Sequence, residues 1–438
     1  MSDMIVMFLQ LSVVFVFFMI SVFLLKTKFT KILNPISLII FWWCFWLMLT
    51  IKSPIGLFPI SIVTIFYVLL FLGSILIGAL LVQSKPFQQA KQINTKPKRN
   101  YVILLMLLVF SLPIFYGLAI NFSKMLNPIE YSLLVRGQDG LFRAIFGSEF
   151  LGNFITMFSM AVVFASLVIG AQQKSHYNRN TLLIFSVLTL LVYTLVSLER
   201  FGLLMIIYVV LFTRICSYWL GDTLLSKKFL IFLTIVLAMI VISSLMRTGG
   251  GVLEILNKYI LMYHTAGFSI LDYNLNNTYD PLEGDIYLGT LNLGFFDRLF
   301  FILSKMVSDT PYISSTLLMN EKLSDLVIIG VAENGEQIKA NAFSTVLFPL
   351  ILDGGPIFII LVGLLWGAVI TRFYFKMISS SNLSEKFNAR VMLVFLLYAA
   401  IASIYQGVFS SQFFWGSILF YLFTRNRFVI RKTRSTCV

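Results

Sequence analysis

The stretch Met4–Leu25 reads MIVMFLQLSVVFVFFMISVFLL, and it decides the fold class. A helix needs about 20 predominantly apolar residues to cross the ~30 Å hydrocarbon core of a bilayer. The runs Ile60–Val82 and Phe229–Met246 have the same character. Backbone N–H and C=O groups in lipid must be satisfied within the segment, and these runs lack the alternation of barrel strands, so we expect helices.

The composition extends this prediction to the whole chain. Of the 438 residues, 59% are hydrophobic and 12% are charged, and the mean hydropathy is +0.91. We therefore predict an all-α, polytopic transmembrane helix bundle with a large, partly helical periplasmic loop. About eleven spans are expected, at residues 4–25, 33–51, 60–83, 101–120, 151–171, 182–198, 201–219, 229–246, 356–375, 390–408 and 411–424.

These spans divide the chain into three parts. Residues 1–246 hold the first eight spans and a smaller outer loop at 121–150. Residues 247–355 form the large periplasmic loop and end in a short re-entrant or interfacial segment. Residues 356–438 hold the last three spans and a basic tail.

The basic residues orient the predicted spans. The segments on one side carry 22 of the 33 basic residues and only two acids, Asp222 and Glu385, whereas the other side has 11 basic and 17 acidic residues. Basic loops stay in the cytoplasm, so we expect the N-terminus outside the cytoplasm and the C-terminus inside it. The net charge of +14 then reflects topology and contact with membrane lipids, and no nucleic-acid partner is expected.

The polar stretch from Arg247 to Asn341 interrupts the apolar chain. Apolar residues recur at helical spacing over 253–267 and 296–307, with polar residues opposite, as in helices that lie in the headgroup plane. Thr310-Pro311 has the pattern of a helix start, and Asp272–Asp285 is rich in turn-forming and acidic residues. We predict a folded cap over the membrane face; the alternative is a solvated loop.

The cap is followed by an apolar run that is too short to cross a membrane. Residues 342–352 lead into Asp353-Gly354-Gly355-Pro356, which predicts a short dipping or interfacial helix that holds Asp353 near the membrane surface. An acidic residue there is costly unless it is paired or functional. In the next span, Gly363 and Gly367 are spaced for close packing against another helix.

Three arginines at the outer ends of spans are candidate anion-binding residues. Arg200 lies at a tight turn between two spans, Arg247 ends the eighth span, and Arg136 lies in the smaller loop. The planar guanidinium fits phosphate oxygens in pairs. The alternative is that these side chains only anchor the spans at the interface.

Other candidate chemistry is sparse. His264 could act as a general acid or base, although a structural role on its helix is favoured. Glu283-Gly284-Asp285 could hold a cation, but we favour an acidic turn. The two histidines and the three unpaired cysteines argue against a metal site, and no phosphate-binding Gly-rich loop exists, so no cofactor is expected.

The chain resembles the Wzy-type O-antigen polymerases, also called oligosaccharide repeat-unit polymerases. The span layout is similar, with two outer loops of which the larger comes late. Ser197–Leu204 resembles the family's segment at a tight outer turn and matches Arg200 to its arginine, although Leu198-Glu199 replaces the usual Gly-Ser. Arg247 matches an arginine that opens the main loop. Asn341–Gly354 resembles a segment that runs from Asn-x-Phe/Tyr-Thr to Asp-Phe-Gly.

The resemblance implies a metal-independent, inverting glycosyltransferase. It would polymerise undecaprenyl-pyrophosphate-linked oligosaccharide repeat units into O-antigen or a related surface polysaccharide. The reaction would take place at the periplasmic face of a bacterial inner membrane, with the N-terminus in the periplasm and the C-terminus in the cytoplasm. Arg200 and Arg247, with Arg136, would bind the pyrophosphate, and Asp353, Glu333 or His264 would take the proton of the attacking hydroxyl. A chain-length regulator protein is a further implied partner. The alternatives are a lipid-linked oligosaccharide flippase or other transporter, and an O-antigen ligase.

Overall fold

The computed structural model is mostly helical. It describes residues 2–29, 31–83, 101–127, 130–131, 145–172, 179–198, 201–223, 230–231, 234, 238, 261–276, 287, 289–308, 312–323, 326–332, 335–340 and 345–425. The chain divides into two compact units. Unit 1 comprises 1–85, 256–374 and 399–412, and unit 2 comprises 86–255, 375–398 and 413–438.

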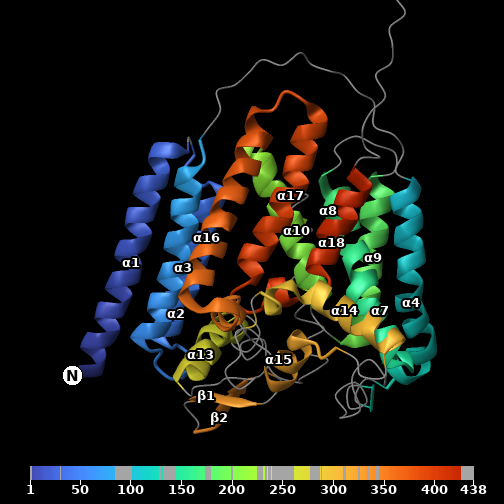
Figure 1. Ribbon diagram of the computed structural model, residues 1–438, viewed down its shortest axis with the longest axis horizontal. Coiled ribbons are helices and arrows are strands. Elements are labelled where there is room, and N and C mark those ends of the chain that lie inside the picture. The colour runs from blue at the N-terminus through green and yellow to red at the C-terminus, as the bar shows by residue number, and fades with distance from the viewer. Residues whose placement is uncertain are drawn as a thin grey trace, which may run out of the picture. The chain divides into compact units, whose positions relative to one another are not determined.

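Unit 1 is built on four long helices that stand side by side (Figure 1). These are α1 (Ser2–Lys28), α2 (Pro35–Lys52), α3 (Ile62–Leu81) and the first part of α16 (Leu347–Ser379). The start of α2 is determined locally. Asn34 accepts hydrogen bonds from the backbone N–H groups of Ile36 and Ser37, Ser37 bonds back to Asn34, and Pro35 occupies the first turn, where its missing N–H costs nothing.

Close packing between α3 and α16 depends on glycine. A Cβ atom added at Gly367 would lie 2.0 Å from the carbonyl oxygen of Ile75, and one at Gly363 would lie 3.0 Å from that of Phe71. Gly78 on α3 approaches the backbone of Leu364 in the same way. The predicted close-packing role of Gly363 and Gly367 is therefore confirmed.

The helix α16 is interrupted near its start, at the place that the sequence predicts. Gly354 and Gly355 have non-helical backbone angles, and Gly355, at φ 62 and ψ −149, occupies a region that essentially only glycine adopts. The break separates a short helix, which starts at Leu347 and includes Asp353, from the long helix that runs from Pro356. Whether the short helix dips into the membrane stays a prediction.

The other elements of unit 1 lie at one end of these helices (Figure 1). They are α13 (Met262–Asn276), the 3-10 helix η3 (Leu291–Leu293), α14 (Gly294–Val307), α15 (Ser315–Leu323), the strands β1 (Val327–Val331) and β2 (Gln337–Ala340), and the 3-10 helix η4 (Val408–Ser410). The two strands pair antiparallel. The loop between α2 and α3 extends this small sheet, because the N–H of Phe58 donates to Ile329.

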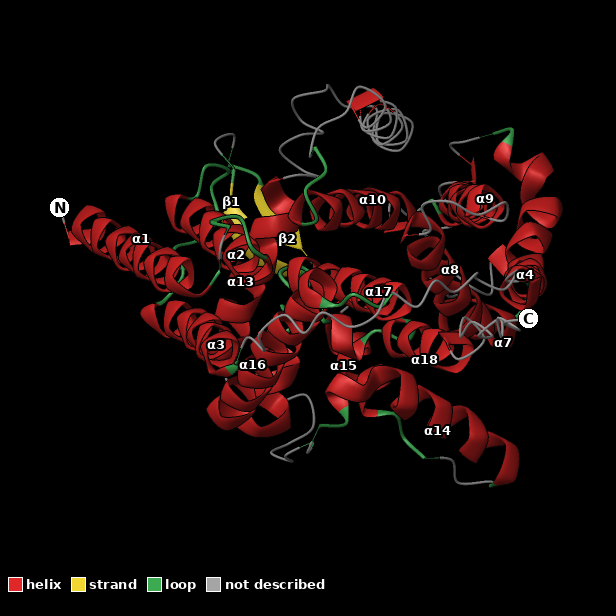
Figure 2. Ribbon diagram, turned by 90° about the horizontal axis from the view of Figure 1, so that it is seen from above, coloured by secondary structure: helices red, strands yellow, loops and turns green. Residues whose placement is uncertain are grey.

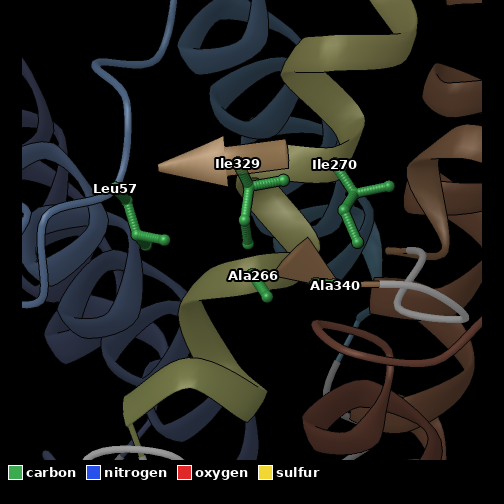
Figure 3. Packing of buried hydrophobic residues seen from close by; sticks show 5 residues of the cluster. All are labelled: Leu57, Ala266, Ile270, Ile329 and Ala340. Carbon is green, nitrogen blue, oxygen red and sulfur yellow. The ribbon is translucent and has the colours of Figure 1, made fainter. Parts of the chain in front are cut away.

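A small hydrophobic core fastens the strands to α13. Ala266 and Ile270 of α13 meet Ile329 of β1, Ala340 of β2 and Leu57 of the α2–α3 loop (Figure 3), and all five are at most 4% exposed. Four separate stretches of the sequence contribute to this core. The described part of the predicted polar loop is therefore folded onto the span-connecting chain, as the predicted cap requires.

Unit 2 is organised around α8 (Met160–Gln172), of which every residue except Ala171 is buried. Figure 2 shows α8 with α4, α9, α10 and α18 around it. The unit comprises α4 (Tyr101–Met125), α7 (Glu149–Phe154), the π-helix η1 (Ile155–Ser159), α8, α9 (Arg179–Ser197), α10 (Phe201–Trp219), most of α17 (Leu383–Ala402) and α18 (Phe414–Arg425).

Seven helices in the described part of the chain are long and apolar enough to cross a membrane: α1, α2, α3, α4, the continuous helix Leu151–Gln172, α10 and α16. Thr181–Ser197 within α9 is a shorter apolar helix. Most of the expected span 229–246 lies outside the described residues. The number eleven and the orientation in the membrane thus stay predictions.

The expected span 390–408 is wrong at both ends. The helix α17 begins at Leu383, so Arg390 lies inside it, where it is 7% exposed and donates to the Ser217 hydroxyl over 3.1 Å. It ends at Ala402 because other groups satisfy its last carbonyls. The indole N–H groups of Trp42 and Trp43 donate to Ile401 and Ala400, so the chain can leave the helix within the protein.

Candidate functional site

The polar segment supplies α13, and this helix is more buried than the sequence suggests. Every residue from His264 to Asp272 is buried. The prediction of an amphipathic helix with one face in lipid is therefore wrong for this part. The prediction that Asp272 begins a turn-rich stretch is wrong as well, because helix α13 continues to Asn276. The cause is that α13 packs against α2, α3 and β1 together.

His264 lies within an aromatic cluster near the start of α13. Its ring stacks on Trp46 at 4.2 Å between centroids, with 14° between the planes. Trp42 and Tyr405 each meet it edge-on at 5.3 Å. The imidazole is 8% exposed, so its environment is that of a packed ring, as the favoured structural interpretation expected. A role as acid or base is not tested by this geometry.

Asp353 is fully buried and engages both of its oxygens. One oxygen accepts the backbone N–H of Leu291 at 3.2 Å. The other accepts the backbone N–H of Asn292 at 3.1 Å and its side-chain amide at 2.5 Å. All three donors belong to the turn of η3 that leads into α14, so Asp353 fastens this helix start to α16. The expectation that a buried acid here is paired or functional is met by pairing.

Asp297 makes the largest set of hydrogen bonds among these carboxylates. It accepts the Tyr312 hydroxyl at 2.6 Å and the backbone N–H groups of Ser315 and Thr316 at 3.3 and 3.1 Å. The hydroxyls of Ser314 and Thr316 donate to it as well. Burial, and then the hydrogen bond to Asp297, raise the pKa of the Tyr312 phenol, which therefore stays a proton donor.

These contacts correct the predicted start of the following helix. The sequence pattern Thr310-Pro311 suggested a cap there, and those two residues lie outside the described ones. The residues Tyr312–Ser314 are not helical, and α15 begins at Ser315. Its first two N–H groups, those of Ser315 and Thr316, donate to Asp297 from α14, and the N–H of Leu317 donates to the hydroxyl of the neighbouring Ser314. A cap supplied from another helix cannot be found by reading local sequence.

Asp272 repeats the arrangement at the start of α3. Its Oδ1 accepts the backbone N–H and the hydroxyl of Ser61, at 2.7 and 2.5 Å, and the hydroxyl of Thr64 at 2.7 Å. Its other oxygen accepts the Asn276 side chain at 3.0 Å. Ser61 is the N-cap residue of α3. Asp272 thereby joins α13 to the end of a predicted span.

The carboxylates of Asp272, Asp297 and Asp353 have the same kind of environment. Each is buried, each accepts hydrogen bonds from uncharged donors, and each lies at the N-terminus of a helix from another part of the chain. Helix N-termini present unpaired N–H groups and a partial positive charge, which stabilise a carboxylate without a basic partner. Sequence reasoning missed Asp272 and Asp297. The run Ser314-Ser315-Thr316 ahead of a helix was the available signal for the second.

The other predicted site residues, Arg136, Arg200, Arg247 and Glu333, lie outside the described residues. The flanking chain agrees with the predicted tight turn at Arg200, because α9 ends at Ser197 and α10 begins at Phe201. Leu198 in this turn has φ 53, a left-handed conformation that costs an L residue about 1 kcal/mol or more. Such strain tends to occur at functional sites.

The described ranges contain no cluster of three or more His, Cys, Asp or Glu side chains that could hold a metal ion. The described candidates also do not form one acid–base pair, since Asp353 bonds to Leu291 and Asn292 and not to His264. Comparison with known proteins finds no matching family model, no similar curated protein and no similar solved structure.

Proposed function

We propose that this protein is a membrane-embedded glycosyltransferase that polymerises undecaprenyl-pyrophosphate-linked oligosaccharide repeat units into O-antigen or a related surface polysaccharide. The proposal rests first on the resemblance in span layout and on the segments that carry Arg200 and Arg247. It assigns the reaction to the periplasmic face of a bacterial inner membrane. The partners are the lipid-linked substrate, the membrane lipids and a chain-length regulator protein.

One structural observation adds support to the resemblance. Helices of the polar segment are fastened to the long apolar helices by buried carboxylates: Asp272 of α13 binds the start of α3, and Asp353 of α16 binds the turn that leads into α14. An enzyme that acts on a lipid-linked glycan has to meet its substrate where headgroup and hydrocarbon join. A folded cap built on span ends provides a surface at that level, whereas a solvated loop does not.

The proposed chemistry is a single displacement. A hydroxyl of the acceptor repeat unit attacks the anomeric carbon of the donor glycan, and the bond from this carbon to the pyrophosphate oxygen breaks. The hydroxyl proton passes to a base, and undecaprenyl pyrophosphate leaves. Arg200 and Arg247, with Arg136, would stabilise the charge on the pyrophosphate. Of the candidate bases, Asp353 has both oxygens engaged, so we favour His264 or Glu333.

A transporter of lipid-linked oligosaccharides is the second candidate, and Arg390 favours it. This arginine is buried within α17, and its Nε atom has no hydrogen-bond partner in the described part of the chain. Buried ionisable groups in membrane helices often mark a transport path. The two candidates differ in their products, since a transporter moves the lipid-linked glycan across the membrane without extending it.

Reconstitution with the lipid-linked repeat unit separates the candidates. Vesicles that contain the purified protein should convert the substrate into a ladder of longer glycans and release undecaprenyl pyrophosphate. In cells, loss of the protein should leave lipid A core capped with a single repeat unit. Loss of all O-antigen, single units included, would instead indicate flipping or ligation.

The arginine assignments have their own test. Arg200→Ala and Arg247→Ala should each abolish the ladder at an unchanged protein level, because the leaving pyrophosphate loses its charge stabilisation. Arg372→Ala serves as the matched control, since this arginine is exposed on α16 and should keep full activity. Long chains made by either loop variant would remove that arginine from the pyrophosphate site.

A further inference from the structure

The helix α14 exposes a row of apolar side chains and buries two charged ones near its start. Phe300, Leu303 and Val307 lie on one face and are 63%, 48% and 88% exposed. Arg298 lies on the opposite face and Asp297 beside it, and they are 3% and 4% exposed. The sequence predicts for this segment a helix in the headgroup plane with one face in lipid. The exposed apolar side chains agree with that prediction, because a helix on a water-facing surface would bury them.

The orientation of α14 about its own axis is determined by several contacts. Asp297 is held by the donors of residues 312–316. At the helix start, a Cβ atom on Gly294 would lie 1.9 Å from the carbonyl oxygen of Ser410, so the backbones touch there. Asp353 holds the preceding turn. A rotation of the helix that buried Phe300 and Leu303 would break these contacts. The same contacts therefore keep the apolar face exposed.

We propose that this face of α14, continued by the 68% exposed Ile313, lies in the interfacial layer of the bilayer that surrounds the spans. The 14 residues of α14 extend about 21 Å, too short to cross the hydrocarbon core. The helix therefore lies along the membrane surface with Phe300 and Leu303 among the upper acyl chains.

Lipid is a better occupant of this face than water or another protein. The same unit contains α1, whose side chains Phe8 and Phe23 are 71% and 69% exposed, as expected of a helix that faces lipid. Bilayer is thus in reach of any surface at the span ends. Lys305, in the last turn of α14, lies 4.5 Å from the centre of the Phe301 ring, a position from which an ammonium group can meet lipid phosphates.

Spin labels measure this placement directly. Full-length protein with Cys44→Ala, Cys216→Ala and Cys437→Ser would carry single labels at Leu303→Cys, at Leu361→Cys in α16 and at Lys339→Cys in β2. Vesicles of phosphatidylethanolamine and phosphatidylglycerol provide the membrane. The Leu303 label should collide with oxygen more often than with a water-soluble nickel complex. Its ratio of oxygen to nickel collisions should be close to that of the Leu361 label and well above that of the Lys339 label.

Two results would overturn the placement. A Leu303 label that meets nickel as readily as the Lys339 label would put α14 in water, and a label shielded from both reagents would show that protein covers the face. A second measurement avoids the cysteine substitutions. Phe300→p-benzoylphenylalanine in the otherwise native chain should give photo-adducts of one phospholipid mass, and adducts with protein alone would refute the inference.

Discussion

The hydrogen bonds of Asp297 make α15 a sensitive test of how the cap is held together. We expect Asp297→Ala to release α15 from α14 while the long helices remain folded. The carboxylate joins the two helices through five donors. The change should therefore lower the free energy of local opening rather than that of global unfolding.

The magnitude follows from which donors water can reach. Tyr312 is 40% exposed and can bond to solvent, and Ser315 is partly exposed. Ser314 and Thr316 are 1% and 2% exposed, so water cannot replace their three bonds to the carboxylate. Each hydrogen bond to a charged group contributes about 1.5 kcal/mol or more, which gives about 4 kcal/mol for the three. That corresponds to about a thousandfold change in the opening equilibrium.

Hydrogen–deuterium exchange of the full protein in detergent micelles is the assay. Amides of residues 315–323 should exchange about a thousandfold faster in Asp297→Ala than in the native chain, with little change in the peptides of α2 and α3. Asp297→Asn should speed the exchange of these amides almost as much, because the NH₂ group of asparagine is itself a donor and cannot accept hydrogen bonds from the donors that face it. Glu321→Gln, at an exposed position of α15, is the matched control. Unchanged exchange in Asp297→Ala, or a native-like Asn variant, would refute the capping argument.

Three further predictions follow from the same contacts and from the topology. Gly267→Ala would place its Cβ 2.2 Å from the Ile404 carbonyl oxygen and should cost about 1–3 kcal/mol, seen as a lower melting temperature, whereas Gly73→Ala, whose nearest atom lies at 3.9 Å, should leave it unchanged or higher. Asp353→Asn should lower the melting temperature and the polymerising activity together; lost activity at an unchanged melting temperature would instead identify Asp353 as the base. Reporter fusions at Tyr279 and Lys228 should report opposite compartments, and agreement between them would overturn the predicted topology.

Hydropathy alone predicts much of the fold because lipid imposes so simple a constraint. The runs that lack charge became the long helices, and the glycine pairs at 354–355 and 363–367 marked a break and a close contact. The end of α17 could not be predicted in this way. It depends on the indole N–H groups of Trp42 and Trp43, which come from a helix more than 350 residues away in the sequence.

Helical periodicity predicts that a helix has two faces, but it does not predict which face is buried. The helix α14 shows why. Its polar face was expected in water, yet Asp297 is buried because residues 312–316 supply hydrogen-bond donors to it, and the adjacent Arg298 is buried as well. The prediction for α13 is wrong for a related reason, since three elements pack against this helix and bury it. Where water and hydrocarbon both border a protein, the elements packed against a helix determine which of its faces is buried, and these elements come from distant parts of the chain.

The use of carboxylates as structural caps narrows the search for catalytic groups. Asp272, Asp297 and Asp353 accept hydrogen bonds from helix N-termini, and a general base must instead keep a lone pair free for its substrate. Removing any of the three would leave N–H groups unpaired, so loss of activity in such a variant identifies a base only where the melting temperature is unchanged. His264 stacks on Trp46 within an aromatic cluster, and Glu333 lies outside the described residues. Under the proposed function, informative mutagenesis therefore begins with these two residues and with the loop arginines, and each variant needs the melting temperature measured beside its activity.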